Sequence, residues 1–154
     1  MKQDYKADIN HFFVTTFNKI LAYEEKSLSN AGLKDISVKE IHIIEAVDAL
    51  TSSGNNTMTQ IAKRISISVG ALTTAVNALV RKGYIYRGSD PKDRRIVYLF
   101  LTESGQKALK IHADFHEKMV DSILSVLDEQ SLASTTKALD ILLDFFENLM
   151  KENP

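Results

Sequence analysis

The stretch GSDPKDRRIVYLFLT, residues 88–102, decides how the rest of the chain is interpreted. Five charged residues and one proline fill positions 90–95, and an almost wholly apolar run follows them. Together with YIYR just upstream (residues 84–87), the apolar run predicts a two-stranded β-hairpin that carries the charges at its tip. A solvated turn does not need an arginine pair, so the reason for the charges has to be sought upstream.

Residues 57–83 predict a helix–turn–helix directly before this hairpin. The segment TMTQ (residues 57–60) is a capping box that opens a short helix ending near Ile65. Ser68 can cap a second helix, which ends at Gly83. A helix–turn–helix followed by a two-stranded wing is typical of DNA-binding proteins.

Longer helices are predicted on both sides of this segment. Apolar residues at helical spacing indicate a first helix that stops at Gly32, and SVKE (residues 37–40) is a capping box for a second, reaching about Leu50. Thr102 and Asp128 can cap two long helices after the hairpin. The predicted fold class is mainly α with a small β-wing, a winged helix–turn–helix with long terminal helices.

Composition places the chain among ordinary globular proteins. Its 154 residues are enough for one domain, with 44% hydrophobic and 25% charged residues. The absence of cysteine excludes disulfides and thiolate metal sites. No run of 18 apolar residues and no signal-peptide pattern occurs, so we expect a soluble cytoplasmic protein with no membrane association.

The net charge of −1 hides an uneven distribution. Residues 57–98 contain eight Lys or Arg and two Asp, a net charge of +6, so the remaining residues carry −7. A basic centre within an acidic protein favours a localised surface for a polyanion such as double-stranded DNA. Chance clustering on a solvated face is the alternative.

The chain resembles the MarR family of bacterial winged helix–turn–helix regulators. The resemblance covers nearly the whole chain and is carried by TQIAKRISISVGALTTAVNALVRKGYIYR (residues 59–87) and DPKDRRIVYLFLTESG (residues 90–105). The second segment contains the Asp–x–Arg wing signature of the family. LKDISVKEIHIIEAV (residues 33–47) and the helix after Thr102 look most like the branch that represses fatty-acid-synthesis genes.

The resemblance implies a homodimeric, sequence-specific regulator, acting as a repressor on a palindromic operator under the control of an effector. Residues 1–154 then form a single MarR-like domain, in which residues 37–101 are the DNA-binding lobe and residues 1–34 and 103–154 are dimerisation helices. The fatty-acid branch implies an acyl chain, or its acyl carrier protein, as effector. Broad apolar faces on the terminal helices agree with a dimer, because one compact domain cannot cover them.

The wing signature also implies roles for the charges at the tip. In the family the Arg of Asp–x–Arg enters the minor groove, which here is Arg95 with Asp93 before it. A narrow A·T-rich minor groove has an enhanced negative potential that attracts a guanidinium. We expect Asp93 to hold Arg95 extended, and Lys92 and Arg94 to reach flanking phosphates.

The second helix of the helix–turn–helix is expected to read the major groove. Leu72, Val76 and Leu79 recur at helical spacing and should pack inward. The outward positions are then Ser68, Gly70, Thr73, Thr74, Asn77 and Arg81. Threonine methyls suit thymine methyls, and Asn can pair with an adenine edge, so an A·T-rich operator is expected. A solvated position is the alternative for Asn77.

Phosphate contacts are expected from polar residues around these helices. Such contacts position the protein without reading sequence. The candidates are Thr57, Thr59, Gln60, Lys63, Arg64 and Lys82.

Histidines form a second constellation. His112 and His116 lie one helical turn apart, and zinc-sensing members of the family bind metal with a Glu and three His at positions that match Glu25, His42 and this pair. Glu24 is the substitute for Glu25 if the alignment shifts by one residue. The alternative function is therefore a zinc-responsive MarR-type regulator. If the histidines only line a pocket, the protein requires no cofactor.

Other function classes fit the sequence less well. It contains no phosphate-binding loop, no Ser/His/Asp signature and no cysteine nucleophile, so we do not expect an enzyme. The basic centre argues against a module that binds only proteins.

Overall fold

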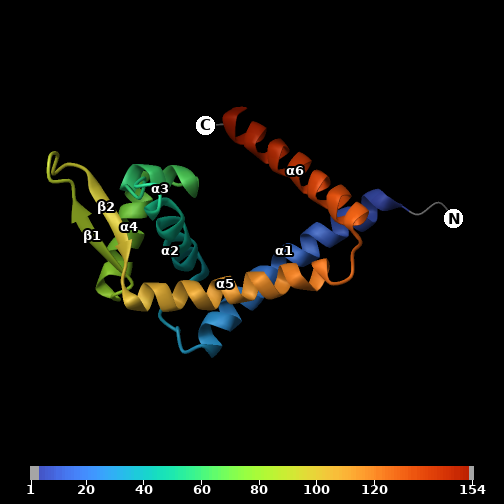
Figure 1. The fold of residues 1–154 in the computed structure, drawn as a ribbon, viewed down its shortest axis with the longest axis horizontal. Coiled ribbons are helices and arrows are strands. Elements are labelled where there is room, and N and C mark those ends of the chain that lie inside the picture. The colour runs from blue at the N-terminus through green and yellow to red at the C-terminus, as the bar shows by residue number, and fades with distance from the viewer. Residues whose placement is uncertain (1–3, 153–154) are drawn as a thin grey trace. The chain divides into compact units, whose positions relative to one another are not determined.

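The computed structural model describes residues 4–152, which form six helices and one two-stranded sheet (Figure 1). The predicted fold class, mainly α with a small β-wing, is confirmed. The elements are α1 (Tyr5–Asn30), α2 (Val38–Thr51), α3 (Met58–Arg64), α4 (Val69–Arg81), β1 (Ile85–Ser89), β2 (Val97–Leu101), α5 (Glu103–Leu124) and α6 (Glu129–Glu152). Two compact units, residues 1–115 and 116–154, divide the chain within α5.

The predicted helix starts are the observed ones because each has a side chain that accepts from the backbone of the first turn. Ser37 and Glu40 cap α2 reciprocally, and the Thr57 side chain accepts from the backbone N–H of Gln60 at the start of α3. Ser68 accepts from the N–H of Ala71 and so opens α4. Each such cap stabilises a helix by about 1 kcal/mol.

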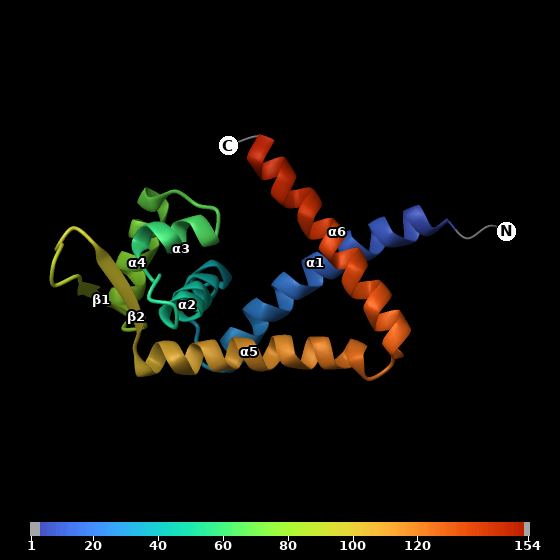
Figure 2. The same ribbon diagram turned by 45° about the horizontal axis from the view of Figure 1, so that its top comes forward.

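The core of the first unit lies between α2, α3, α4 and the hairpin, which are grouped together in both ribbon views (Figures 1 and 2). Leu72, Val76 and Leu79 of α4 are fully buried, as their spacing predicts. Each fully buried side chain of this size contributes about 1.5–3 kcal/mol. The other fully buried large side chains are Ile41, Ile44, Val47, Ile61, Ile85 and Leu99.

One side-chain and one backbone hydrogen bond join the loop before α3 to the hairpin. Strands β1 and β2 are antiparallel, with Ile85 opposite Leu101 and Ser89 opposite Val97. The buried Asn56 donates from Nδ2 to the Leu99 carbonyl at 2.7 Å and accepts from the Leu99 N–H at 2.9 Å. The wing is therefore fixed to the loop before α3 at the middle of β2, in addition to its chain connections to α4 and α5.

A close backbone approach joins the base of the hairpin to α5. A Cβ at Gly105 would collide with the Tyr84 carbonyl oxygen, so only glycine fits there. Thr102 reinforces the junction, because its hydroxyl donates to the Gly83 carbonyl and accepts from the Gly105 N–H. This junction fixes where the long α5 leaves the wing.

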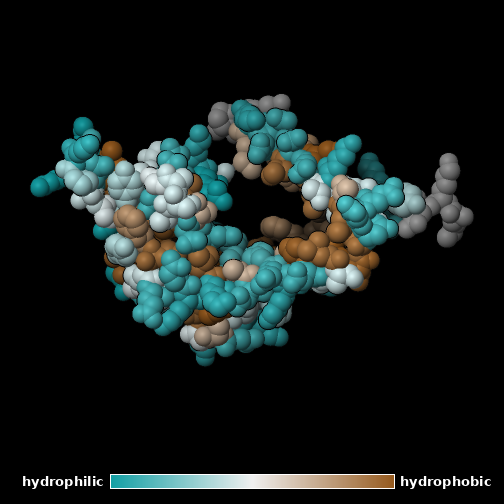
Figure 3. Space-filling view, viewed as in Figure 1, coloured by the Kyte–Doolittle hydropathy of each residue, from teal (hydrophilic) through white to brown (hydrophobic). Residues whose placement is uncertain are grey.

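The terminal helices leave much of their apolar surface uncovered. The N-terminal half of α1 exposes several large hydrophobic side chains, and none of residues 129–151 of α6, whose burial is described, is buried. Brown, hydrophobic atoms are visible on α6 in Figure 3, whereas the wing tip is mainly teal. The exposed side chains include Ile9, Phe12, Phe13, Phe17, Leu139, Ile141, Leu143, Phe145, Phe146 and Leu149. None of the helices between residues 4 and 152 has the length and hydrophobicity of a membrane span.

Candidate nucleic-acid interface

The helix–turn–helix places its polar residues at the surface. The turn between α3 and α4 passes through Ser66 with a φ of 55°, and the Ile67 N–H closes it on the Ala62 carbonyl at 3.0 Å. All predicted DNA-contact residues are exposed except Thr57 and Asp93, which are half-buried. On α3, α4 and their caps these are Thr57, Thr59, Gln60, Lys63, Arg64, Ser68, Gly70, Thr73, Thr74, Asn77, Arg81 and Lys82.

The threonines of α4 turn their hydroxyl groups toward their own helix. Thr73 Oγ1 donates to the Val69 carbonyl at 2.7 Å, and Thr74 Oγ1 donates to the Gly70 carbonyl at 3.3 Å. Their hydroxyl hydrogens are used inside the helix, so both residues offer methyl groups and oxygen lone pairs outward. This geometry suits contact with thymine methyl groups.

Asn77 has a partner on the wing. Arg87 Nη2 donates to Asn77 Oδ1 at 2.7 Å, which connects β1 to the middle of α4. Arg87 lies on the same strand face as the buried Ile85, one pleat nearer the wing tip. Both members of the pair are exposed, so the contact lies at the surface that α4 and the wing share.

The wing tip is built around two aspartates. Asp90 Oδ1 accepts from the backbone N–H groups of Lys92 and Asp93 at 2.6 and 3.0 Å, which shapes the turn. Asp93 accepts from Arg95 through Nε and Nη2, both at 3.0 Å, and also from its backbone N–H. The hydrogen bonds from Arg95 hold the pKa of Asp93 below its ordinary value, while the Arg95 side chain remains 91% exposed.

The three cationic residues of the wing tip are exposed to solvent. Lys92, Arg94 and Arg95 are exposed, and the two carboxylates are used in organising the backbone and the Arg95 side chain. The acidic residues therefore serve the shape of the tip, and the cations face the solvent.

Lys82, which was predicted to contact a DNA phosphate, forms an ion pair with Glu40 within the protein. Its ammonium lies 2.7 and 2.9 Å from the two carboxylate oxygens of Glu40, the residue that also caps α2 with Ser37. Burial by itself would raise the pKa of Glu40, but the hydrogen bonds from Lys82 and Ser37 outweigh it and lower that pKa. Lys82 thus ties the end of α4 to the start of α2.

A buried acidic and histidine group lies within the first unit. Glu24, His42 and His112 each offer a ligand atom, and these atoms lie within 4.8 Å of one another. His42 Nε2 is 3.4 Å and His112 Nδ1 is 3.9 Å from Glu24 Oε1, and Glu24 and His112 are buried. Glu45 Oε2 approaches His112 Nε2 to 3.7 Å.

The structure does not bring the whole predicted metal set together. Glu24, the substitute ligand, takes the place predicted for Glu25, because a shift of one residue turns a side chain by about 100° around a helix. Glu25 is exposed and lines a separate cavity. His116 follows His112 by one turn of α5 and is not among the three grouped residues.

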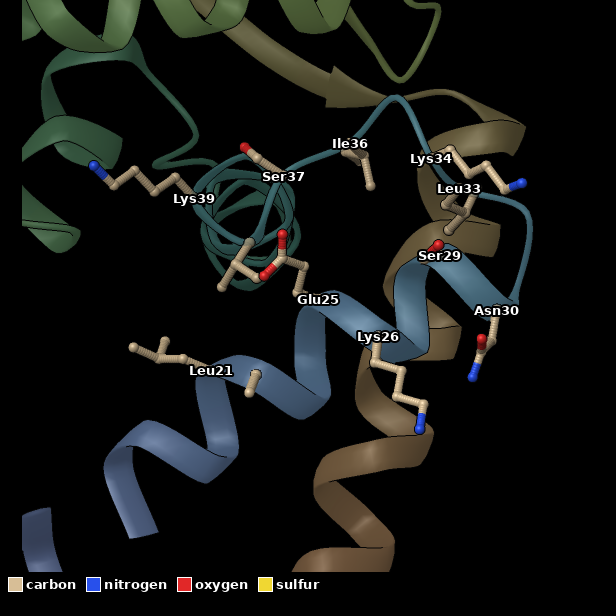
Figure 4. A pocket seen from close by; sticks show the side chains of 12 residues that line it. Leu21, Glu25, Lys26, Ser29, Asn30, Leu33, Lys34, Ile36, Ser37 and Lys39 are labelled. Atoms are coloured by element: carbon tan, nitrogen blue, oxygen red, sulfur yellow. The ribbon is translucent and has the colours of Figure 1, made fainter. Parts of the chain in front are cut away.

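That cavity has a volume of about 950 Å³ and lies at the C-terminal half of α1 and the start of α2 (Figure 4). Its lining combines apolar side chains, including Leu21, Leu33 and Ile36, with cationic ones. The side chains of Glu25, Lys26, Lys34 and Lys39 are seen around it in Figure 4. Such a lining suits a ligand with an apolar part and an anionic part.

The sequence did not predict the roles of three residues, Arg87, Asp90 and Asn56, that support this interface. Arg87 could have been found from its position two residues after the buried Ile85, which puts it on the helix-facing side of the strand. Asp90 begins DPKD, a pattern typical of a turn closed by an aspartate side chain. No sequence signal distinguishes the buried Asn56 from its neighbours in a polar loop.

Comparisons with known proteins agree with this geometry. The MarR family profile matches residues 36–97. The structure of Streptococcus pneumoniae FabT in complex with DNA is 37% identical, with a TM-score of 0.83, and the match covers 95% of this chain and 99% of that one. The transcriptional regulator AdcR of Streptococcus pyogenes is 30% identical over 74% of this chain and 75% of its own length.

The similarity extends to a relative in Bacillus subtilis. Its HTH-type transcriptional regulator YpoP is 27% identical over 90% of this chain and 91% of its own length. Two such matches, to FabT and to AdcR, exceed what a shared fold alone would give, since they reach 30% identity over most of both chains. The chain belongs to the MarR family and is a winged helix–turn–helix transcriptional regulator.

Proposed function

We propose that this protein is a homodimeric repressor that binds a palindromic, A·T-rich operator in the cytoplasm. The observation that carries the proposal is the wing tip, where Asp93 holds the exposed Arg95 guanidinium by two hydrogen bonds of 3.0 Å. A free arginine side chain loses about 2 kcal/mol of rotamer entropy when it is immobilised. The hydrogen bonds to Asp93 already restrict the Arg95 side chain in the free protein, so less rotamer entropy is lost when DNA binds.

The assignment of grooves follows from the chemistry of each element. The exposed positions of α4 and of its cap include Ser68, Gly70 and two threonines but no cation before Arg81, so bidentate reading of guanine is not expected there. Arg95 at the wing tip suits a narrow minor groove, which A·T-rich sequences favour. Lys63 and Arg64, at the end of α3, are suited to phosphates.

Homodimerisation is proposed from the uncovered apolar faces. Large side chains such as Phe17 on α1 and Phe146 on α6 are exposed among the residues that the structure describes. Contiguous apolar surface of this kind marks an interaction site in soluble proteins. A second copy supplies matching faces and a second recognition helix, which a palindromic operator requires.

For the effector we propose an acyl chain, free or on its carrier protein. The support is the cavity of about 950 Å³ next to α1 and α2, together with the resemblance of residues 33–47 to the branch of the family that represses fatty-acid-synthesis genes. Leu21, Leu33 and Ile36 suit the apolar chain, and the lysines around the cavity suit an anionic group. Native mass spectrometry of the purified protein would report a retained acyl ligand and the dimer mass together.

DNA recognition is tested by selecting duplexes from a randomised pool with the purified protein. A two-fold symmetric A·T-rich sequence should be enriched. On that sequence Arg95→Ala should lose about 1–3 kcal/mol of binding free energy, measured by fluorescence anisotropy, and less on a scrambled duplex. Lys63→Ala should weaken both duplexes alike and lower the salt slope by about 1.

Both variants change exposed side chains, so thermal melting should be unchanged and a loss of binding cannot be ascribed to unfolding. Equal losses on both duplexes for Arg95→Ala would show that it reads no groove shape. Failure to enrich any sequence would remove the operator-binding proposal itself.

Zinc-responsive regulation is the second candidate, because Glu24, His42 and His112 fit a metal. In a tetrahedral zinc site with ligands at about 2.0–2.1 Å, the ligand atoms lie about 3.4 Å apart. The distances of 3.4 and 3.9 Å from Glu24 Oε1 are near that value. Bound zinc would cross-link α1, α2 and α5 through these three residues.

The zinc candidate is tested by calorimetric titration of the metal-stripped protein. Wild type should bind one zinc per chain, and Glu24→Gln and His42→Ala should lose that binding, whereas Glu25→Gln should keep it because Glu25 lies outside the group. By linkage, a metal that raises operator affinity must itself bind more tightly in the presence of operator. No zinc binding by wild type would leave the histidines as structural residues only.

A further inference from the structure

The surface between β1 and α4 contains one charge-assisted hydrogen bond that the roles assigned so far do not use. Arg87 Nη2 donates to Asn77 Oδ1 at 2.7 Å. The residues are 10 positions apart and come from different elements, so the contact depends on how the wing packs against α4. Hydrogen bonds with one ionised partner are stronger than neutral ones.

This contact determines which way the Asn77 amide points. An amide has an oxygen end that accepts and a nitrogen end that donates, and the two ends have nearly the same shape. A guanidinium has donors only, so it can pair with Oδ1 but not with Nδ2. Arg87 therefore turns the oxygen of Asn77 toward the wing and leaves the two N–H donors of Nδ2 for another partner.

The neighbouring side chains make those donors distinctive. Thr73 and Thr74, which share the exposed part of α4, have their hydroxyl hydrogens on the carbonyls of Val69 and Gly70. Compared with these two residues, Asn77 is the one that presents N–H donors outward, at about one turn's distance along the helix.

We propose that Arg87 is a positioning residue for base recognition: it sets Asn77 to read hydrogen-bond acceptors in the major groove. The acceptors there are N7 of purines, O6 of guanine and O4 of thymine, whereas the amino groups of cytosine and adenine are donors. This inference rests on the proposed DNA binding through α4. It replaces the two-bond pairing of Asn77 with adenine, which needs the amide oxygen for the base.

The first part of the test changes the amide into a carboxylate. Asn77→Asp keeps an oxygen for Arg87 and replaces the N–H donors by a second acceptor. Selection from a randomised duplex pool should then shift the preferred base at one position of each half-site from a base with a major-groove acceptor toward cytosine, which offers only a donor there. We expect a change in preference of about tenfold at that position and little change elsewhere.

The second part removes the positioning residue and keeps Asn77. Arg87→Met has similar length but no donors, so the amide can turn over, and the preference should relax at the same position that Asn77→Asp shifts. Arg64→Met removes the same charge from the end of α3 and should weaken binding to all sequences without changing any base preference. In Asn77→Ala protein, Arg87→Met should have no further effect on the preference at that position.

Two results would overturn the inference. One is that Arg87→Met lowers affinity on every sequence equally, as Arg64→Met does, because Arg87 would then only contact phosphate. The other is that Arg87→Met changes a different position from Asn77→Asp, because Arg87 would then read a base by itself. If wild type selects no sequence at all, the proposed operator binding fails instead, and unchanged melting temperatures would separate both cases from unfolding.

Discussion

The winged lobe and the terminal helices differ in how far their large apolar side chains are buried. In the lobe, side chains such as Ile41 and Leu72 are fully buried among α2, α3, α4 and the hairpin. In α6 and the N-terminal half of α1, side chains such as Phe17 and Leu143 remain 64% and 58% exposed. The lobe buries its apolar side chains within one chain, whereas these parts of the terminal helices leave theirs exposed.

This difference separates two physical tasks. A DNA-reading surface needs a rigid support, and the lobe has one in its buried core and in the bonds from Asn56 to β2. Correct placement of two such surfaces needs a partner, and the exposed apolar faces are where a second copy would be held. The expected effects of mutation should follow the same division.

The largest effect should come from charges in the apolar face of α6. Leu143→Glu with Phe146→Glu should convert the dimer to monomers, because both side chains are about half exposed in the single chain and would be buried against a partner. Operator affinity should fall by about 100-fold or more, since two half-sites are no longer held together. Sedimentation velocity and anisotropy measure the two effects.

Lys137→Glu is the matched control for that pair. It changes the net charge by the same two units on a polar position of α6 and should leave the dimer intact. The melting transition of the lobe should survive in all these variants, because the described residues that form its core come from elements before α6. A dimer that persists with both glutamates would place the interface elsewhere.

The next predictions compare two glycines, one required for packing and one on the proposed DNA-binding surface. Gly105→Ala should destabilise the lobe by roughly 3 kcal/mol, because its Cβ meets the Tyr84 backbone oxygen, which cannot move aside without shifting the hairpin. Denaturant unfolding measures this change.

Gly70→Ala on α4 should have the opposite sign. Its Cβ would meet only Ser68 Oγ at 3.9 Å, and replacing an exposed helical glycine by alanine stabilises by about 0.5–1 kcal/mol. If the glycine is there for close approach to DNA, operator affinity should fall while stability rises. A rise in both would show that Gly70 has no part in binding.

The smallest effect tests the Glu40–Lys82 pair that joins α2 to α4. Glu40→Gln retains a capping oxygen for Ser37 and loses the ion pair, so it should cost about 1 kcal/mol at neutral pH. Since the pKa of Glu40 is lowered in the folded protein, this contribution is present above about pH 4.5 and is lost as the pH falls through the lower folded-state value.

The difference in unfolding free energy between wild type and Glu40→Gln should therefore shrink below that pH. Ser37→Ala provides the comparison, because it removes a cap and leaves the ion pair with Lys82 in place. A difference that stays constant down to pH 3 would mean that the ion pair does not stabilise the lobe.

Local patterns were enough to predict most of the fold. The capping residues Ser37, Ser68 and Asp128 start helices as expected because their side chains act on the adjacent turn of the same segment. The inward positions of α4 follow from helical spacing in the same way. Information of this kind lies within a few residues of sequence.

Contacts between distant segments were harder to predict. Glu24 and Glu25 are adjacent, and only the packing of α1 against α2 determines which one meets His42. Lys82 is expected at phosphates by its charge, but Glu40, 42 residues away, lies beside it. Arg87 and Asn77 meet only because the wing folds back on α4.

The central claim is that the DNA-binding lobe folds within one chain and that the exposed apolar faces of α1 and α6 pair two chains. Sedimentation of the protein alone and with its selected duplex tests this claim most directly. The account predicts a dimer at micromolar concentration and a complex of two chains on one two-fold symmetric duplex, with a duplex of one half-site bound far more weakly. A stable monomer that binds a half-site as tightly as the full site would contradict it.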